Sequence, residues 1–124
     1  MKINIDPLCE ITPQQQRIKE LTVLFASYEV EQLKTNFASD IVWHLVSDQP
    51  IKGKDNFANA LLQMKGNKVK ALTIHHIITH RKTAAIHGIM NMKDGNAYGF
   101  SDFYEFESDE LAKIKSITSY VLKL

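Results

Sequence analysis

The spacing of hydrophobic residues along this chain changes from a helical period to a strand period. Thr12 and Pro13 are typical of a helix start, because threonine caps the first turn and proline lacks an N–H that this turn leaves unpaired. The helix that follows is expected to run to about Tyr28. Its apolar face contains Ile18, Leu21, Leu24, Phe25 and Tyr28.

Two further helices are expected before the run of four consecutive strands, the second of them after a first, separate strand. The phase of the pattern breaks near Tyr28, which predicts a second short helix. Its apolar residues are Val30, Leu33 and Phe37. A third helix is expected to be capped by Asp55 and to end at Gly66. Its apolar stripe contains Phe57, Leu61 and Met64.

Strand patterns make up most of the remaining chain. Ile41–Val46 is short, β-branched and aromatic, which predicts a first strand, whereas residues 1–11 are expected to be an arm and 47–53 a loop. Four more strands are expected at about 69–80, 83–92, 98–106 and 113–122. This order predicts a single α+β domain over residues 1–124, in which about three N-terminal helices pack on a curved antiparallel sheet and enclose a pocket.

The segment Tyr98–Phe106, YGFSDFYEF, suggests what lines that pocket. Alternate side chains of a strand point to opposite faces. One face of this strand then carries Asp102 among aromatic side chains. The aromatic residues are Tyr98, Phe100, Tyr104 and Phe106. Because a carboxylate is costly to bury without a partner or a purpose, this face is expected to line a small-molecule pocket.

Composition argues against several classes of partner and location. The net charge of +1 provides no field that would attract nucleic acid or an anionic membrane. No stretch approaches the roughly 18 apolar residues of a membrane-spanning helix, and the N-terminal residues do not resemble a signal peptide. The single cysteine, Cys9, excludes an intrachain disulfide framework. We therefore expect a cytoplasmic protein.

No metal or cofactor is expected. His76 and His80 would lie about 13 Å apart along one strand, whereas two nitrogens bound to one zinc ion each lie about 2 Å from it. His75 and His76 are expected to point to opposite faces. A metal site would need His44 or His87 to converge with one of these histidines. No glycine-rich nucleotide-binding motif occurs either.

Four segments of the chain carry a family resemblance. They are FASDIVWHL from Phe37, IKGKDNF from Ile51, KDGNAYGFSDFYEF from Lys93 and IKSITSY from Ile114. In their order and spacing they resemble the nuclear transport factor 2-like superfamily, and within it the SnoaL-like branch. The resemblance implies a cone-shaped α+β barrel with an open pocket, dimeric through the outer face of its sheet. Members include isomerases, epoxide hydrolases, polyketide cyclases, dehydratases and non-catalytic binders, so the fold alone specifies no reaction.

The ketosteroid isomerase site can be compared with this chain position by position. That enzyme uses an aspartate base, and its oxyanion hole contains a tyrosine and a protonated aspartate. The oxyanion aspartate corresponds to Asp102, but the base falls on Leu45 and the tyrosine on about Leu21. Leucine neither accepts nor donates a proton, which argues against the same isomerisation. The Asp-Arg-Asp set of the epoxide hydrolase has no counterpart either.

The resemblance also implies which side chains of the strand at 83–92 face the pocket. The inward residues are Ala85, His87, Ile89 and Asn91. The outward residues are Ala84, Ile86, Gly88, Met90 and Met92. An outward apolar row with two methionines is unusual on a monomer, and we expect it to form the interface of a homodimer.

The other strands complete the expected lining. The inward residues of the first strand are Ile41, Trp43 and Leu45, and those of the last strand are Ile117, Ser119 and Val121, with Tyr120 outward. We expect a ligand to contact Trp43, Asn91, Tyr98, Phe100, Tyr104 and Ser119.

His87 and Asp102 are the candidates for catalysis. A carboxylate that orients an imidazole on the adjacent strand is a usable acid–base pair near neutral pH. The structural alternatives are a core Asp102 bonded to tyrosine or serine hydroxyls and a His87 of no special role. Both residues could also contact a ligand without chemistry.

Three functions follow from these expectations. The first is the binding of a small lipophilic or aromatic molecule in the cavity of a homodimer. The second is a lyase, isomerase or cyclase reaction in which His87 and Asp102 act on an enolisable substrate. The third is a non-catalytic interaction module whose cavity is filled by side chains. If His87 or Asp102 faced outward, the second would be excluded, and a cavity volume near zero would exclude the first.

Overall fold

Three helices form close to the predicted positions, but Phe37, expected on the second helix, instead pairs with Ile114 in the sheet. The computed structural model describes residues 1–124 and contains α1 (Pro13–Ala26), α2 (Val30–Lys34) and α3 (Lys54–Gln63). Thr12 caps α1 as expected. Its hydroxyl accepts a hydrogen bond from the Gln15 N–H at 3.3 Å, and the Gln15 side chain accepts one from the Thr12 N–H at 2.7 Å. Tyr28, whose φ of 57° is left-handed, separates α1 from α2.

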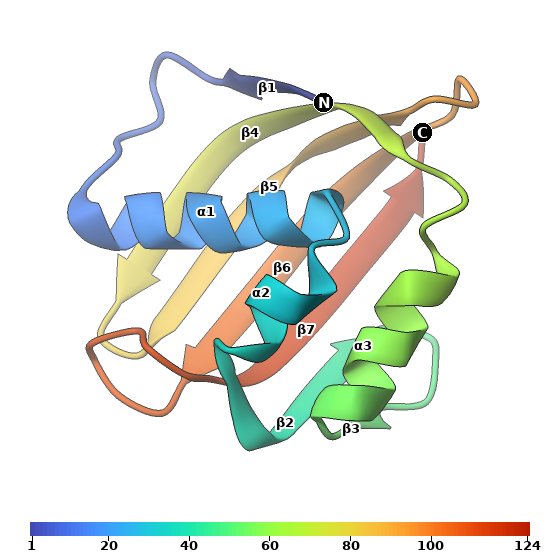
Figure 1. The fold of residues 1–124 in the computed structure, drawn as a ribbon. Helices are drawn as coiled ribbons and strands as arrows, with labels where there is room; N and C mark the ends of the chain where they lie inside the picture. The colour runs from blue at the N-terminus through green and yellow to red at the C-terminus, as the bar shows by residue number, and fades with distance from the viewer.

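The start of α3 differs from the expectation. The N-cap residue is Gly53, not Asp55, and its φ of 90° lies in the region that favours glycine. The Asp55 carboxylate instead lies 3.0 Å from the Lys34 ammonium and joins α3 to α2. All three helices lie on one side of the sheet, as Figure 1 shows.

Seven strands form one curved sheet that does not close. They are β1 (Lys2–Ile5), β2 (Phe37–Leu45), β3 (Ile51–Lys52), β4 (Val69–His80), β5 (Thr83–Met92), β6 (Ala97–Phe106) and β7 (Ile114–Lys123), in the order β1-β4-β5-β6-β7-β2-β3. The expected antiparallel meander is confirmed as β4 to β7. Two pairings, β1 with β4 and β2 with β7, are parallel. The α+β class and the helices on one face of a curved sheet are confirmed.

Two strands lie where the sequence predicts irregular backbone. β1 falls in the expected arm, and β3 in the expected loop. Both are short and lie at the edges of the sheet, and β1 continues into a bond from the Asp6 N–H to the Ile74 carbonyl at 2.9 Å. Backbone pairing at an edge needs no apolar alternation, so the sequence pattern does not reveal these strands.

The β5–β6 hairpin corrects the expected register. A four-residue turn over 93–96 would place Met92 opposite Ala97 and His87 opposite Asp102. The loop has only three residues, because the Met92 N–H bonds to the Asn96 carbonyl at 2.8 Å and Gly95 takes a left-handed φ of 93°. Ile86 therefore pairs with Asp102 and His87 with Ser101. A shift of one residue exchanges the two faces of a strand.

As a result, the expected inward and outward rows of β5 are reversed. Ala84, Ile86 and Met92 are buried in the core. His87 and Asn91 are exposed on the outer face, and Ile89 lies between them on the same side. The methionine row therefore does not form an outward interface, and the prediction that His87 faces the cavity is wrong.

A β-bulge in β4 changes the outer face further. The register of β4 against β5 shifts between Ile74 and His76. Gly88 lies opposite this bulge, and a Cβ atom on it would be 1.8 Å from the Thr73 carbonyl oxygen, so only glycine fits. The extra residue places the rings of both His75 and His76 near His87, at centroid distances of 5.5 and 4.9 Å. The expectation that His75 and His76 point to opposite faces is therefore wrong.

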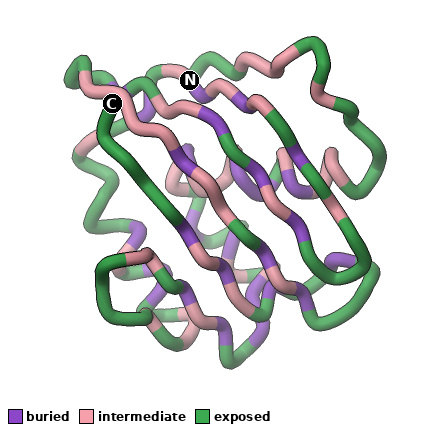
Figure 2. Tube along the Cα trace, turned by 180° about the vertical axis from the view of Figure 1, so that it is seen from behind, coloured by how far each residue is buried: buried purple, intermediate pink, exposed green.

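The core lies between the helices and the concave face of the sheet. Phe57 of α3 is fully buried, and its ring stacks on Trp43 and on Phe37 at centroid distances of 4.5 and 4.6 Å. From behind, Figure 2 shows buried and more exposed positions alternating along the strands, as the strand period requires. None of the helices is long and apolar enough to cross a membrane.

Candidate functional site

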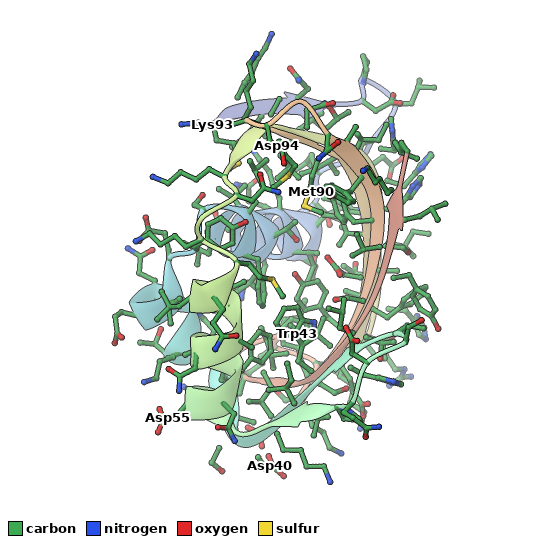
Figure 3. All side chains as sticks on the ribbon, turned by 90° about the vertical axis from the view of Figure 1, so that its right-hand side faces the viewer. Asp40, Trp43, Asp55, Met90, Lys93 and Asp94 are labelled. Atoms are coloured by element: carbon green, nitrogen blue, oxygen red, sulfur yellow. The ribbon has the colours of Figure 1, made fainter.

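A cavity of about 470 Å³ lies between the helices and the concave face of the sheet. Of its 22 lining residues, 16 are hydrophobic, and Asp102 is the single charged one. Figure 3 looks at it from the side, with Trp43 and Met90 between the helices and the curved sheet. The cavity is not filled by side chains, which removes the basis of the filled-core alternative.

The structure brings together most of the expected lining residues. Six of them border the cavity: Trp43, Tyr98, Phe100, Asp102, Tyr104 and Ser119. The inward faces of β2 and β7 are also as expected, with Leu45, Ile117 and Val121 on the cavity. The three residues expected from β5, which are His87, Ile89 and Asn91, lie on the other face of the sheet. Met90 and Met92 take their place.

Asp102 lies in a small polar network inside the apolar cavity. Ser119 is its cross-strand partner on β7, and the Ser119 hydroxyl accepts a hydrogen bond from the Trp43 indole N–H at 3.0 Å. That hydroxyl donates its own hydrogen to the Asp102 carboxylate. Burial raises the pKa of Asp102 to about 6, and the bond from Ser119 opposes this rise. Asp102 can therefore exchange a proton close to neutral pH.

Tyr104 carries a second polar group toward the cavity, but its hydrogen is already in use. The Thr22 hydroxyl donates to the Ile18 carbonyl at 2.9 Å, so the bond of 3.1 Å between Thr22 and Tyr104 is donated by the Tyr104 hydroxyl. Burial, together with the nearby Asp102 charge, raises the pKa of Tyr104 far above its ordinary value. Tyr104 therefore stays neutral and has only acceptor capacity left for a ligand.

The mouth of the cavity is formed where α3 leads into β4. Gln63, Met64 and Gly66 are exposed and line it from this side, and half-exposed Val121 lines it from β7. The Tyr28 hydroxyl donates to the Asn67 carbonyl at 2.8 Å, which fastens the α3–β4 connection to the end of α1. The helices thus hold the rim in place.

The outer face of the sheet contains a histidine cluster that the sequence interpretation missed. His76 Nδ1 and His87 Nε2 are 2.7 Å apart, close enough to share one proton, and His75 lies beside them. Partial desolvation of the ring, together with the neighbouring His76 and His75, lowers the pKa of His87. No group of three or more His, Cys, Asp or Glu side chains has the arrangement of a metal site. The isolated glycine at 88 was the available signal for the bulge that builds this cluster.

The sequence matches one protein family over most of its length. Residues 18–114 match the SnoaL-like domain. The chain belongs to the SnoaL-like domain family. No curated protein matches the sequence.

Solved structures of SnoaL-like and NTF2-like proteins resemble this chain. An NTF2-like protein of unknown function from Cytophaga hutchinsonii is 28% identical, with a TM-score of 0.64 over 86% of this chain and 97% of that one. A putative SnoaL-like polyketide cyclase from Shewanella denitrificans has a TM-score of 0.75 at 11% identity, over 90% and 92% of the chains. An LEH-like epoxide hydrolase from M. tuberculosis has a TM-score of 0.70 at 14% identity, over 86% and 80%. The last two likenesses concern the fold alone.

Proposed function

We propose that this protein binds a small lipophilic molecule in its cavity, with one polar group of the ligand against Asp102. The observation that carries this proposal is a single carboxylic acid in an otherwise uncharged and mostly hydrophobic lining. The volume of about 470 Å³ lies within the range of small-molecule sites. Apolar contact supplies the affinity, and the one acid fixes the orientation.

The protonation of Asp102 determines which polar group it accepts. When protonated, the acid donates to a ligand carbonyl. When ionised, it accepts from a ligand hydroxyl. With a pKa of about 6, both forms are accessible near neutral pH. Ketones, lactones and alcohols on an apolar ring or chain are therefore the ligand classes that fit.

A thermal-shift screen tests this proposal. 2-Tetralone, 2-naphthol and apolar lactones are expected to raise the melting temperature of the wild type, because a ligand at 100 times its Kd adds about 2.7 kcal/mol to the stability. Asp102→Asn should weaken the binding of at least one ligand class. The matched variant Asp40→Asn changes an exposed aspartate on β2 and should not weaken binding. Val121→Trp, which narrows the mouth, should weaken all classes. Shifts that survive Val121→Trp unchanged would place the binding elsewhere and contradict the proposal.

An enzyme that uses Asp102 alone is the second candidate. Its raised pKa suits a base that removes a proton from the carbon beside a ligand carbonyl. The C–H bond breaks, the proton passes to Asp102, and the electron pair moves to the carbonyl oxygen as an enolate. His87 has no part in this, because it lies on the opposite face. The Tyr104 hydrogen, already donated to Thr22, is not free to stabilise the enolate, so binding without turnover ranks first.

Proton exchange distinguishes the two candidates. In D₂O, an active enzyme would replace the α-hydrogens of 2-tetralone faster than buffer does, and Asp102→Asn would remove the acceleration. A binder without turnover would show the thermal shift and an exchange rate equal to that of buffer. An acceleration that persists in Asp102→Asn would exclude Asp102 as the base.

We also propose a homodimer. Its interface contains residues of the outer face other than the expected methionine row. Exposed Phe103 and Tyr120 pack edge to face at 6.0 Å, near exposed Ile78. Beside them lies a hollow of about 310 Å³ over Ala85 and Thr118. A two-fold axis places the aromatic pair of each copy in the hollow of the other. Four strands of eight residues cover roughly 500 Å² in projection, the scale of a standard interface of about 800 Å² of accessible surface per partner.

Sedimentation equilibrium tests the homodimer. The wild type is expected to be a dimer at micromolar concentration, and Phe103→Glu a monomer, because a charge would be buried in the interface. Leu62→Glu makes the same change on the exposed side of α3 and should leave the dimer intact. A monomeric wild type, or a dimer unaffected by Phe103→Glu, would contradict this assembly.

A further inference from the structure

Exposed lysines lie on two of the connections that border the cavity. Figure 3 shows Lys93 at one end of the molecule, above Met90, and Asp40 and Asp55 at the opposite end. The connection between β6 and β7 adds exposed acids, which are Glu107, Asp109 and Glu110. The connections at the mouth of the cavity carry mainly lysines.

Three lysines from two connections gather beside the mouth. Lys65 and Lys68 flank Gly66 and Asn67, which line the cavity. The Lys93 N–H donates to the Lys68 carbonyl at 2.9 Å, so the β5–β6 hairpin lies directly against the α3–β4 connection. All three lysines are exposed, and none takes part in an ion pair.

Asp94 is the one acid in these two connections, and it bonds within its own turn. The two carboxylate oxygens of Asp94 accept hydrogen bonds from the backbone and side-chain nitrogens of Asn96 at 2.9 and 3.1 Å. The two connections therefore carry three lysines and one aspartate, an excess of positive charge. The mouth has the charge and the free donors to hold an anionic group.

The interior fixes which end of a ligand can carry that anionic group. Four residues along β6 separate Tyr98, near the mouth, from Asp102, a distance of roughly 13 Å. A ligand anion beside Asp102 would place two carboxylates together in an apolar cavity, which is unfavourable. An anionic head must therefore stay at the lysines, with the apolar body directed inward.

We infer that the ligand is amphipathic, with an apolar body in the cavity and a carboxylate or phosphate head held at the mouth by Lys65, Lys68 and Lys93. The inference rests on the proposed binding function, and it adds the charge class of the ligand and its orientation. Either head group supplies the same chemistry, an anion on an apolar chain.

The test compares decanoate, decyl phosphate and 1-decanol below their micelle concentrations, by calorimetry at low and high salt. Decanoate, decyl phosphate or both should bind the wild type about tenfold more tightly than 1-decanol, and added salt should reduce this preference. The stronger anion identifies the head group. In Lys65→Gln/Lys68→Gln/Lys93→Gln the preference should disappear while 1-decanol still binds. The matched variant Lys52→Gln/Lys82→Gln/Lys115→Gln removes the same charge elsewhere and should keep the preference.

The outcomes separate this inference from the proposed function. Equal binding of 1-decanol and both anions to the wild type would overturn the anionic head and leave the lipophilic cavity intact. An equal loss of preference in both triple variants would assign it to net charge rather than to the mouth, which also overturns the inference. If none of the three probes bound, or if Val121→Trp had no effect on their binding, the cavity itself would be excluded for such ligands and both proposals would fall.

Discussion

The concave and outer faces of the same sheet provide opposite environments for their titratable groups. On the concave face Asp102 is a lone acid in an apolar cavity, and burial raises its pKa to about 6. On the outer face His76 and His87 are exposed. A hydrogen bond of 2.7 Å joins His76 Nδ1 to His87 Nε2, so each ring has one nitrogen with a partner. The free-energy cost of placing a polar group in the fold therefore depends on its hydrogen-bond partners. The outer pair is self-sufficient, whereas Asp102 has capacity left for a ligand.

The outer histidine cluster depends on the β4 bulge opposite Gly88, and breaking the close contact there should have the largest effect. Gly88→Ala places a methyl group 1.8 Å from the Thr73 carbonyl oxygen, so the strands must separate. We expect a loss of about 4 kcal/mol or more, measured by urea unfolding, or no folded protein. Gly66→Ala, with no atom within 4 Å of the added methyl, should change stability by less than about 1 kcal/mol. Equal losses in the two variants would contradict the close contact at Gly88.

Removing the charge of Asp102 should stabilise the protein. The folded pKa of about 6 lies above the ordinary value of 3.8, so between these values the native state holds a proton that the unfolded state has released. Stability therefore falls as pH rises from about 4 to about 6, by up to about 3 kcal/mol. Asp102→Asn should remove this slope and be more stable than the wild type at pH 7. Asp40→Asn is the control, and a wild-type slope retained in Asp102→Asn would contradict the burial argument.

Breaking the network behind Asp102 should have a smaller, destabilising effect. Ser119→Ala leaves the buried Trp43 N–H without an acceptor and removes a donor to the carboxylate. The expected cost is about 1–3 kcal/mol. The pKa of Asp102 should also rise further, because the bond from Ser119 lowers it. Carboxyl ¹³C NMR measures that pKa, and a value unchanged in Ser119→Ala would show that the bond is unimportant.

The pair of His76 and His87 should have the smallest effect on stability. Its pH dependence should be opposite to that of Asp102. The pKa of His87 is lowered, so below the ordinary value of 6.5 the unfolded state binds more protons, and this group lowers stability as pH falls. His76→Gln should raise the pKa of His87 part of the way toward 6.5, because the desolvation remains while the charge interaction with His76 is removed. Imidazole NMR titration measures this shift, with His44→Gln as the control. An unchanged pKa of His87 in His76→Gln would mean that the pair is not formed.

The sequence predicted the fold well because the fold depends on long, repeated patterns. The helical spacing of α1 and the two-residue period of β6 each extend over many positions, and both elements form where expected. β1 and β3 were missed because four and two residues at a sheet edge carry no such pattern. The parallel pairings of β1 and β2 are long-range contacts that leave no mark in the local sequence.

The lining of the site was predicted correctly only on those strands whose register was predicted correctly. β2, β6 and β7 present the expected residues to the cavity, whereas β5 presents the opposite set. The difference is one residue in the loop before β6, where Gly95 makes a three-residue turn. The expected acid–base pair of His87 and Asp102 rested on the inward row of β5 that the family resemblance implied, and the observed pairing reverses that row. Asp102 remained in place because its own strand sets its face.

Methionine methyl NMR shows directly whether a ligand binds at the concave face of β5. The chain has four methionines, of which Met64, Met90 and Met92 line the cavity and Met1 lies exposed at the N-terminus. With methyl-labelled protein, saturating decanoate or 2-tetralone should shift the Met90 and Met92 signals strongly and leave Met1 unchanged. Signals from Met90 and Met92 that stay unchanged while a ligand is bound would show that the concave face of β5 is not the binding surface, and would contradict the account.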